Sequence, residues 1–498
     1  MVIELQGYVE PTPRVRAATL RSLLIGAGEA GRAMAQALRR VPDYGLLPIG
    51  FLDDNPIRRQ VACLPVLGSI GDMAAVAAAN NVDVALVTIP SLPPRRIAEI
   101  AARAHAVGLL VRFLPSFGDA LERDVRLSDL RSVRIDRLLG RDEVHVIRSA
   151  SRSVIAGRRV LVTGAGGSIG SELCRQIDHF EPAALYMLDH DESNLHRLQL
   201  ELRGHGLLDT DDIIIADIRD RGRLWQLFHE LRPEVVFHAA AHKHLPLLER
   251  HPCEGVKSNV AGTHHVMECA VATGVERVIL ISTDKAADPS SVLGATKRLA
   301  EMILRHYAGR ETLIASVRFG NVLGSRGSLL SVLESQIERG EMVTITHPDV
   351  TRFFMTVEEA VGLVLEAAVM ATTGEVFVLD MGEPVLIVDL VRNYTAQLHG
   401  NADDVVIRFT GLRPGEKLDE TLISQDEERT PTAHPKIWNS RTSTELPADF
   451  ERSLQQLYAA STENNIREVR RLLAALVPGY RPTLGDSTAA VAPYPDDW

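Results

Sequence analysis

The stretch RRVLVTGAGGSIG, residues 158–170, decides the fold class of the chain. An apolar strand runs into a loop with the pattern T-G-x-x-G-x-x-G, formed by Thr163, Gly164, Gly167 and Gly170, and a helical pattern follows. Glycines permit a tight turn, and the free N–H groups at the start of the next helix favour a pyrophosphate. This is the first unit of a doubly wound α/β domain, although the same glycines could serve only a turn.

Further along, strand-like and helical segments alternate. Six apolar runs follow one another: VLVTG, ALYMLD, IIIAD, VVFHAA, RVILIST and LIASVRFG. They predict one complete parallel sheet. An earlier glycine-rich segment, RSLLIGAGEAG at residues 21–31, begins in the same way. The fold class is therefore α/β, with two Rossmann-like doubly wound parallel-sheet domains in series, the second with a smaller carboxy-terminal substrate-binding subdomain.

Changes in composition give the expected boundaries. We predict a leader at residues 1–20, a first Rossmann-like domain at 21–133 and a polar connector at 134–157. A catalytic domain follows at 158–437, with the substrate subdomain mainly at 320–437. A helical tail is expected at 438–498.

Composition excludes several classes of protein. The chain has 54 basic and 65 acidic residues and a net charge of −11, so it lacks the basic footprint of a nucleic-acid binder. Its four cysteines form no CxxC pair, which favours a reducing compartment over a disulfide scaffold. No run of about 18 apolar residues is free of charge, so no membrane span is predicted.

Side chains at the ends of the next strands complete a dinucleotide site. Asp189 ends its strand 19 residues beyond Gly170, where a carboxylate binds the adenosine ribose. A 2′-phosphate would face Asp189, Asp191 and Glu192 and no arginine, so NAD is favoured over NADP. Asp217 is placed to bind adenine. Further cofactor contacts are expected from Ser168, Ile169, Ile218, Ala239, Ala240 and Asn259, the last as a support for the cofactor loop.

The first glycine loop is a weaker candidate. Gly26, Gly28 and Gly31 match G-x-G-x-x-G, and Asp53 lies at the ribose distance. Glu29, however, lies inside the loop at the helix N-terminus, where it would repel a pyrophosphate. A vestigial or regulatory fold is therefore favoured over a nucleotide site, and two nucleotides bound per chain would reverse that preference.

A possible catalytic group follows the strand RVILIS. Thr283, Asp284 and Lys285 lie at its carboxyl end, where ligands meet open α/β sheets. Eight residues later, Leu293 and Lys297 share one helix face. Short-chain dehydrogenases have Tyr-x-x-x-Lys here, and leucine cannot take a proton. The Thr-Asp-Lys triplet is the nearest source of acid and base, unless it is only a solvated ion pair.

Five motifs occur in order and resemble bacterial nucleoside-diphosphate-sugar dehydratases: TGAGGSIGSEL, AAAHKHLPLLE, ISTDKAADPSSVLGATKR, RFGNVLGSRGS and TGLRPGEKLDETL. The chain is most similar, over about residues 20–435, to the long, CapD-like UDP-N-acetylglucosamine 4,6-dehydratases, which are lyases of the nucleotide-sugar branch of the extended short-chain dehydrogenase/reductase superfamily. Long-form members usually carry transmembrane helices before the position of residue 20, and methionine in place of Leu293.

The resemblance implies an internal redox dehydration. NAD would take hydride from C4 of the sugar and return it to C6, giving a UDP-2-acetamido-2,6-dideoxy-4-keto-hexose. Thr283 would hold the C4 hydroxyl, Asp284 would protonate the departing C6 hydroxyl, and Lys285 would remove the C5 proton. Lys297 would hold the nicotinamide ribose and help to deprotonate the C4 hydroxyl. Asp284 must then start protonated and Lys285 neutral, although each favours the charged form of the other.

The resemblance also implies residues for the substrate, UDP-N-acetylglucosamine. Arginine suits a diphosphate and glutamate suits ribose hydroxyls, although RPGEK could be an ordinary charged turn. The expected substrate residues are Lys243, which would face the sugar or the nicotinamide, and Asn321, Arg326, Arg413 and Glu416. The neighbouring histidines His238, His242 and His244 lack carboxylates in a ligand pattern, so no metal site is predicted.

Two other functions remain open. One is a 4-epimerase or a dehydratase for another NDP-sugar, and Leu293 counts against the epimerase. The other is a non-catalytic NAD-binding scaffold or sensor, against which the retained triplet and Lys297 count. The resemblance further implies at least a dimer, a cytoplasmic active site, and association with the membrane in a longer parent protein.

Overall fold

The structure is a computed structural model, and the chain divides into two compact units. The described residues up to 113 and those of 392–399 lie in the first unit, and those of 149–391 and 405–480 lie in the second. The described residues are 20–40, 46–54, 59–89, 96, 100, 103–104, 106–113, 149–204, 210–323, 329, 332–333, 336, 341–399, 405–442 and 445–480.

The first unit contains a six-stranded sheet in the order β3-β4-β2-β1-β5-β6. Its pairs are parallel except the antiparallel pair β3 and β4. This confirms the first Rossmann-like domain, with α1 following the glycine loop. The elements are β1 (Leu20–Ile25), α1 (Glu29–Arg40), β2 (Leu46–Leu52), β3 (Gln60–Val61), β4 (Leu64–Gly68), α2 (Met73–Asn80), β5 (Val84–Val87) and β6 (Leu110–Phe113).

The second unit is built around a nine-stranded sheet in the order β20-β21-β17-β12-β11-β10-β7-β8-β9. The six expected strands are β7 to β12, and their spatial order is the doubly wound order 3-2-1-4-5-6. The strands are β7 (Arg159–Thr163), β8 (Ala184–Asp189), β9 (Ile213–Ile215), β10 (Val235–His238), β11 (Arg277–Ile281), β12 (Leu313–Arg318), β17 (Thr373–Leu379), β20 (Glu427–Pro431) and β21 (Ile437–Thr442).

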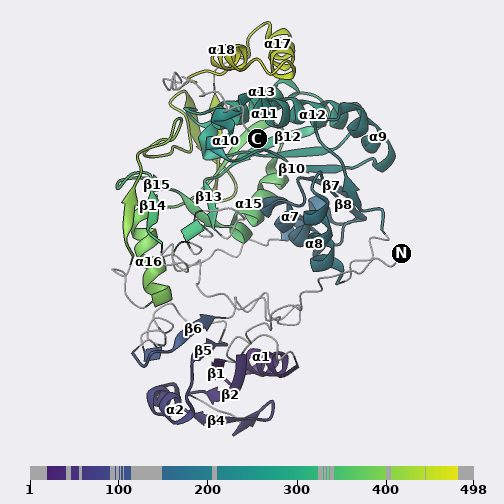
Figure 1. Cartoon of the computed structure of the whole chain (residues 1–498). Helices are drawn as coiled ribbons and strands as arrows, with labels where there is room; N and C mark the ends of the chain where they lie inside the picture. The colour runs from purple at the N-terminus through teal and green to yellow at the C-terminus, as the bar shows by residue number, and fades with distance from the viewer. Residues whose placement is uncertain are drawn as a thin grey trace, which may run out of the picture. The chain divides into compact units, whose positions relative to one another are not determined.

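Helices cover both faces of this sheet, as Figure 1 shows. Alternate residues of one strand enter different cores, since Val160 and Val162 pack on one face and Leu161 on the other. The first face carries α6 (Ser149–Ile155), α7 (Ser168–Asp178), α8 (Glu192–Arg203) and α15 (Val357–Met370). The other carries α9 (Arg221–Leu231), α10 (Leu245–Arg250), α11 (Pro252–Gly255), the π-helical turn η4 (Val256–Gly262), α12 (Thr263–Ala272) and α13 (Val292–His306).

The structure differs from the expected boundaries at both ends of the second unit. The sequence predicts a connector as far as residue 157, whereas α6 packs on α15, where the Ser151 hydroxyl donates to Glu366 at 2.6 Å. Residues 134–148 of that connector lie outside the described residues. The sequence also predicts a tail from residue 438, whereas β21 pairs antiparallel with β17 and belongs to the sheet.

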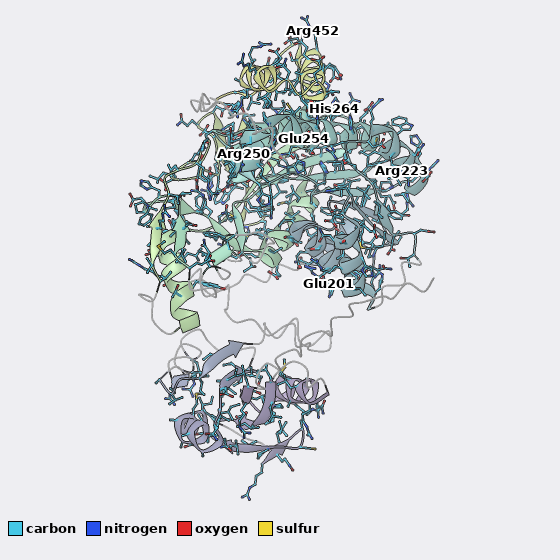
Figure 2. The ribbon with its side chains drawn as sticks, in the orientation of Figure 1. Glu201, Arg223, Arg250, Glu254, His264 and Arg452 are labelled. Carbon is cyan, nitrogen blue, oxygen red and sulfur yellow. The ribbon has the colours of Figure 1, made fainter. Side chains whose placement is uncertain are left out.

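Two helices lie within the segment predicted as the tail. Helices α17 (Phe450–Thr462) and α18 (Ile466–Leu476) pack on α11 and η4 (Figure 1). His264 of α12, labelled in Figure 2, lies between Tyr458 of α17 and Tyr307, which follows α13. One ring nitrogen of His264 is 2.9 Å from the Tyr458 hydroxyl, and the other is 2.9 Å from the Tyr307 hydroxyl. The tail helices therefore contribute to the core of the second unit.

Short strands after residue 320 form the expected subdomain beside the sheet. They pair as β13 (Asn321–Leu323) with β16 (Phe354–Thr356), β14 (Val343–Ile345) with β19 (Ile407–Phe409), and β15 (Thr351–Arg352) with β18 (Val385–Leu386). Helix α16 (Ile387–His399) follows β18. Within the described part of the chain, no helix combines the length and the apolar character needed to cross a bilayer.

Candidate active site

The glycine loop follows β7 at the point where the strand order reverses. Gly164 has φ +69°, and a Cβ on it would lie 2.6 Å from the backbone nitrogen of Ala240. A Cβ on Gly170 would lie 2.0 Å from the carbonyl oxygen of Gly164. Gly167 is the N-cap of α7 and provides no side-chain hydrogen bond to the helix. The loop is therefore tight, and it leads into a first turn of α7 that has no side-chain cap from Gly167.

Asp189 is bound to this loop. Its carboxylate accepts from the backbone nitrogens of Gly166 at 2.9 Å and Asp191 at 3.0 Å. The first domain repeats the relationship, because Asp53 accepts from the backbone nitrogen of Ala27 at 2.7 Å. Both carboxylates thus fix the shape of a glycine loop, whatever ligand they meet.

Asp217 has a partner that the sequence pattern does not reveal. The Arg219 guanidinium donates to both its carboxylate oxygens, with Nε at 3.0 and 2.8 Å. Burial alone would raise the pKa of Asp217, but the hydrogen bonds from Arg219 outweigh it and lower that pKa. Arg219 also pairs at 3.3 Å with Glu254, labelled in Figure 2. Arg219 therefore lies near the position predicted for the adenosine of the cofactor. Its positive charge is paired with the carboxylates of Asp217 and Glu254.

A buried layer beneath the loop connects β7, β10 and the helices behind them. The His238 ring nitrogens lie 2.7 Å from the Thr163 hydroxyl and 3.0 Å from that of Thr263. Burial, with Lys297 nearby, lowers the pKa of His238 to about 3, so the ring is neutral.

Within the described residues we find no group of three or more side chains that could hold a metal ion.

Asn259 lies in η4 and holds the segment after β10. Its amide oxygen accepts from the backbone nitrogen of His242 at 2.8 Å, and its nitrogen donates to the carbonyl of His242 and the hydroxyl of Thr296, both at 3.1 Å. Asn259 therefore supports the segment after β10 and α13, and its expected support of the cofactor loop stays a prediction. Lys243, in the same segment, is exposed.

The remaining predicted cofactor residues follow β7, β9 and β10. Ile218 is buried and packs on Gly262, where a Cβ would lie 2.6 Å from it. Ser168 and Ile169 form the first turn of α7, and Ala239 and Ala240 follow β10. Ser168, Ile169, Ala239 and Ala240 lie near the carboxyl ends of β7 and β10. These two ends are side by side because Thr163 pairs with His238.

The predicted triplet lies after β11, where Thr283 is the N-cap of a short turn, η5 (Asp284–Ala286). The Thr283 hydroxyl donates to Asp284 Oδ1 at 2.8 Å, and Lys285 Nζ donates to the same oxygen at 3.0 Å. Helix α13 packs directly on this turn, because a Cβ on Gly294 would lie 2.2 Å from the Lys285 carbonyl oxygen. The glycine that follows Leu293 therefore fixes the distance between the helix and the triplet.

The triplet is more buried than its sequence suggests. Asp284 has no exposed surface, whereas the Lys285 side chain keeps 18% of its surface. A ligand that reaches this site meets Lys285 and Thr283 before the carboxylate. Burial alone would lower the pKa of Lys285, but Asp284 and Glu420 outweigh it and raise that pKa.

Lys297 lies one turn of α13 beyond Leu293 and is 6% exposed. Its Nζ donates to the carbonyl oxygen of Ile281, at the end of β11, at 2.5 Å. Burial lowers its pKa to about 8, against the opposing effect of Glu301. A neutral amine is thus accessible near physiological pH.

The RPGEK turn packs over the start of α13. The Ser290 hydroxyl donates to the carbonyl of Gly415 at 2.9 Å, and Lys417 Nζ donates to that of Ala287 at 3.2 Å. Gly415 has φ +76°, and a Cβ there would lie 2.8 Å from Ser291 Cβ. The turn is therefore in contact with the segment between the predicted triplet and α13.

The predicted substrate residues are not all free to bind. Glu416 Oε1 accepts from Arg352 at 3.1 Å, and its Oε2 accepts from the backbone nitrogen of Arg413, whose side chain is exposed. The Asn321 amide oxygen lies 3.4 Å from Lys285 Nζ, so Asn321 lies beside the lysine of the predicted triplet. Arg326 lies outside the described residues.

Sequence reasoning missed Arg352 and Glu420. Arg352 is buried and holds both Glu416 and the carbonyl of Leu418, the latter at 2.9 Å. Glu420 Oε1 lies 3.8 Å from Lys285 Nζ. The only sequence signal was the motif itself, TGLRPGEKLDETL, which ends with Glu420 and its neighbours.

Comparison with known proteins gives the family. The model described as "Polysaccharide biosynthesis protein" matches residues 160–442. The chain belongs to this family. A second model, described as "CoA-binding domain", matches residues 12–115 and so covers the first Rossmann-like domain.

Two curated relatives from the polysaccharide biosynthesis family extend over both domains. The chain is 41% identical over 435 residues to the probable polysaccharide biosynthesis protein EpsC of Bacillus subtilis (strain 168), covering 86% of this chain and 72% of that protein. It is 37% identical over 442 residues to the capsular polysaccharide biosynthesis protein CapD of Staphylococcus aureus, covering 88% and 74%. The solved structure of Pen from Bacillus thuringiensis is 32% identical, with a TM-score of 0.53, and covers 58% of this chain and 90% of that one.

Proposed function

We propose that the chain is an NAD-dependent UDP-N-acetylglucosamine 4,6-dehydratase that makes a UDP-2-acetamido-2,6-dideoxy-4-keto-hexose for polysaccharide or glycan biosynthesis. The observation that carries the proposal is the contact between Lys285 and Asp284 at 3.0 Å, beside a helix that has Leu293 where related dehydrogenases have tyrosine. The names of the relatives, which concern polysaccharide synthesis, agree with such a product.

The residues of the second glycine loop fit a dinucleotide. The space above Gly164 and Gly170 is closed by backbone, so the turn is tight, and the first turn of α7 has no side-chain cap. Asp189, at the end of the neighbouring strand, is a carboxylate at the ribose position. When bound, NAD would supply the hydride acceptor for C4 and the donor for C6. Lys297, beneath this position, would bind the nicotinamide ribose.

The triplet would supply the proton chemistry. Lys285 has the exposed surface needed to reach C5, and neutral Lys285 would remove the C5 proton. Asp284 would provide the proton for the departing C6 hydroxyl. Because its carboxylate is fully buried, this role requires the turn η5 to open towards the sugar, or the proton to pass through the Thr283 hydroxyl at 2.8 Å. Thr283 would otherwise hold the C4 hydroxyl.

For the substrate, we propose that exposed Arg413 binds the diphosphate and that Lys243 faces the sugar. Arg326 keeps the same proposed role. Glu416, already held by Arg352, would bind ribose hydroxyls with its remaining lone pairs. Asn321 would contact the sugar next to Lys285. We further propose a cytoplasmic active site and at least a dimer.

Product analysis tests the proposal. The purified chain, saturated with NAD, is incubated with UDP-N-acetylglucosamine, and the sugar is followed by NMR and mass spectrometry. We expect loss of one water and a 6-deoxy-4-keto product. Formation of UDP-N-acetylgalactosamine would identify a 4-epimerase, and bound NAD with unchanged sugar would favour a scaffold or a different NDP-sugar. Either result would reject the proposal.

A further inference from the structure

Glu420 places a second carboxylate beside Lys285, from a segment 135 residues further along the chain. Its Oε1 lies 3.8 Å from Lys285 Nζ, and its side chain is 3% exposed. Its Oε2 is buried and has no hydrogen-bond partner among the described residues, and the same is true of Asp284 Oδ2. Two carboxyl groups therefore flank one amine, and each has an oxygen that nothing in the described structure satisfies.

The nearby cations are occupied elsewhere. Arg352 donates to Glu416 at 3.1 Å and to backbone carbonyls, and Lys417 donates to the carbonyl of Ala287. If Asp284, Lys285 and Glu420 were all ionised, these three groups would together carry a net charge of −1, with no hydrogen bond from Arg352 or Lys417 to Asp284 or Glu420 among those of the described residues. Such a charge is costly in a buried site without hydrogen bonds. The cluster is therefore neutral when Glu420 holds a proton.

Local electrostatics act in the same direction. Burial raises the pKa of Glu420, and the neighbouring Asp284 adds to this rise, while Lys285, Arg352 and Lys417 oppose it. The net effect is a pKa above the ordinary value for a glutamate. A protonated Glu420 is thus the favoured partner of the charged pair Lys285 and Asp284.

We propose that Glu420 is a positioning residue of the acid–base set, whose protonated form allows Lys285 to pass its proton to Asp284. The proposal deepens the function proposed above and rests on it. In this step an N–H bond of Lys285 breaks, an O–H bond forms on Asp284 Oδ1 across the 3.0 Å hydrogen bond, and the net charge stays zero. The result is the neutral amine and the protonated acid that the dehydration requires.

Ionised Glu420 prevents this step. Its negative charge, 3.8 Å from Nζ, stabilises the ammonium form of Lys285 and keeps the base protonated. The protonation state of Glu420 therefore decides whether Lys285 can pass its proton to Asp284. Protonation of Glu420 thus removes one of the two carboxylates that favour the charged form of Lys285, while Asp284 remains in contact with it.

Lysine NMR tests the coupling without any substrate. The chain contains six lysines, Lys243, Lys257, Lys285, Lys297, Lys417 and Lys436, so side-chain labelling gives few signals, and single substitutions assign them. We compare NAD-saturated wild type with Glu420→Gln, which mimics the protonated form. The pKa of Lys285 should fall by about one unit or more in Glu420→Gln. An unchanged pKa would overturn the proposal.

Asp419→Asn is the matched control. Asp419 is the adjacent, exposed carboxylate and accepts from the Thr351 hydroxyl at 2.6 Å, outside the cluster. Its substitution should leave the Lys285 pKa as in wild type, and a fall equal to that of Glu420→Gln would contradict a specific coupling. Should Glu420→Gln fail to fold, Glu420→Asp serves instead. Withdrawing the carboxyl by one methylene should also lower the Lys285 pKa, and no change would count against the proposal.

Kinetics provide the second readout. The ratio of kcat for Glu420→Gln to kcat for wild type should rise as the pH rises through the raised pKa of Glu420, because only the wild type loses a proton at this position. KM should be unchanged, and a flat ratio would overturn the proposal. If wild type does not turn over the sugar, the proposed function fails. The Lys285 titration then still decides whether Glu420 controls this amine.

Discussion

Lys285 Nζ lies 3.0 Å from Asp284 Oδ1, and these two groups are neighbours in sequence at the tip of β11. Their contact explains how a helix without a tyrosine could still support acid–base chemistry. It also keeps the pair charged at rest, because the carboxylate, together with Glu420, raises the pKa of the amine. Function at this site depends on reversing that ionisation.

Removing either member of the pair should stop the reaction. We expect Asp284→Asn and Lys285→Ala each to lower turnover by at least about a hundredfold, because each removes one proton-transfer group. Neither residue touches the glycine loop in the structure, so NAD content, measured by absorbance after denaturation, should stay at the wild-type level. Near-normal turnover in either variant would remove these roles.

The glycine loop makes a separate prediction about cofactor binding. Gly164→Ala should lose bound NAD, because the new Cβ would lie 2.6 Å from the Ala240 backbone nitrogen at a φ of +69°. Gly204→Ala is the control, since Gly204 has φ +74° but no described atom within 4 Å of the added Cβ. It should cost about 1 kcal/mol of stability and keep NAD. Equal NAD loss in both variants would mean that backbone strain alone is responsible.

Lys297 should reduce stability while serving function. Its folded pKa of about 8 lies below the unfolded value of 10.5, so the unfolded chain binds more protons between these values. The free energy of unfolding should therefore rise with pH from about 8 to 10.5. Lys297→Met should abolish this slope, stabilise the chain by about 3 kcal/mol at pH 7 and eliminate turnover. Urea unfolding at several pH values measures this, and an unchanged slope would refute it.

A buried ion cluster ties β12 to α13 and β20. Arg318, which has no exposed surface, donates to Glu301 at 2.8 and 2.7 Å and to Glu427 at 2.7 and 2.9 Å. Arg318→Met should cost about 3–5 kcal/mol, because it leaves two carboxylates buried without this partner. The exposed pair of Arg152 and Glu181 gives the control, where Arg152→Met should cost less than about 1 kcal/mol. Urea unfolding should separate the two variants, and similar costs would contradict this expectation.

The same cluster should make the chain sensitive to acid. Burial alone would raise the pKa of Glu427, but Arg318 and Arg298 lower it far below the usual 4.5. Its contribution to stability is therefore complete above about pH 4.5 and is lost as the pH falls below that value. Glu427→Gln should flatten the dependence of the unfolding free energy on pH in this acidic range. A wild-type slope in that variant would show that other carboxylates are responsible.

Local patterns made the fold largely predictable. The strand, turn and helix around Gly164 lie within a few residues of one another, and the six strands β7 to β12 are apolar runs between helical segments. Strands β17 and β21 were missed because they follow the irregular segments after residue 320. Their place in the sheet depends on pairing with strands far away in the sequence.

The site was predictable where its residues are close in sequence. Thr283, Asp284 and Lys285 are consecutive, and Lys297 follows at helical spacing. Glu420 was missed because its contact with Lys285 spans 135 residues, and nothing local distinguishes it from Asp419 beside it. The sequence also does not reveal that the Asp284 side chain is fully buried. Nor does it reveal that Asp217 is paired with Arg219.

Solvent deuterium in the product tests the central claim most directly. With UDP-N-acetylglucosamine in deuterated water, a base at Lys285 should exchange the proton at C5 while hydride moves from C4 to C6. We predict a 6-deoxy-4-keto product with one deuterium at C5, and none of this product from Lys285→Ala. A product formed by wild type without deuterium at C5, or by Lys285→Ala at the wild-type rate, would contradict the account.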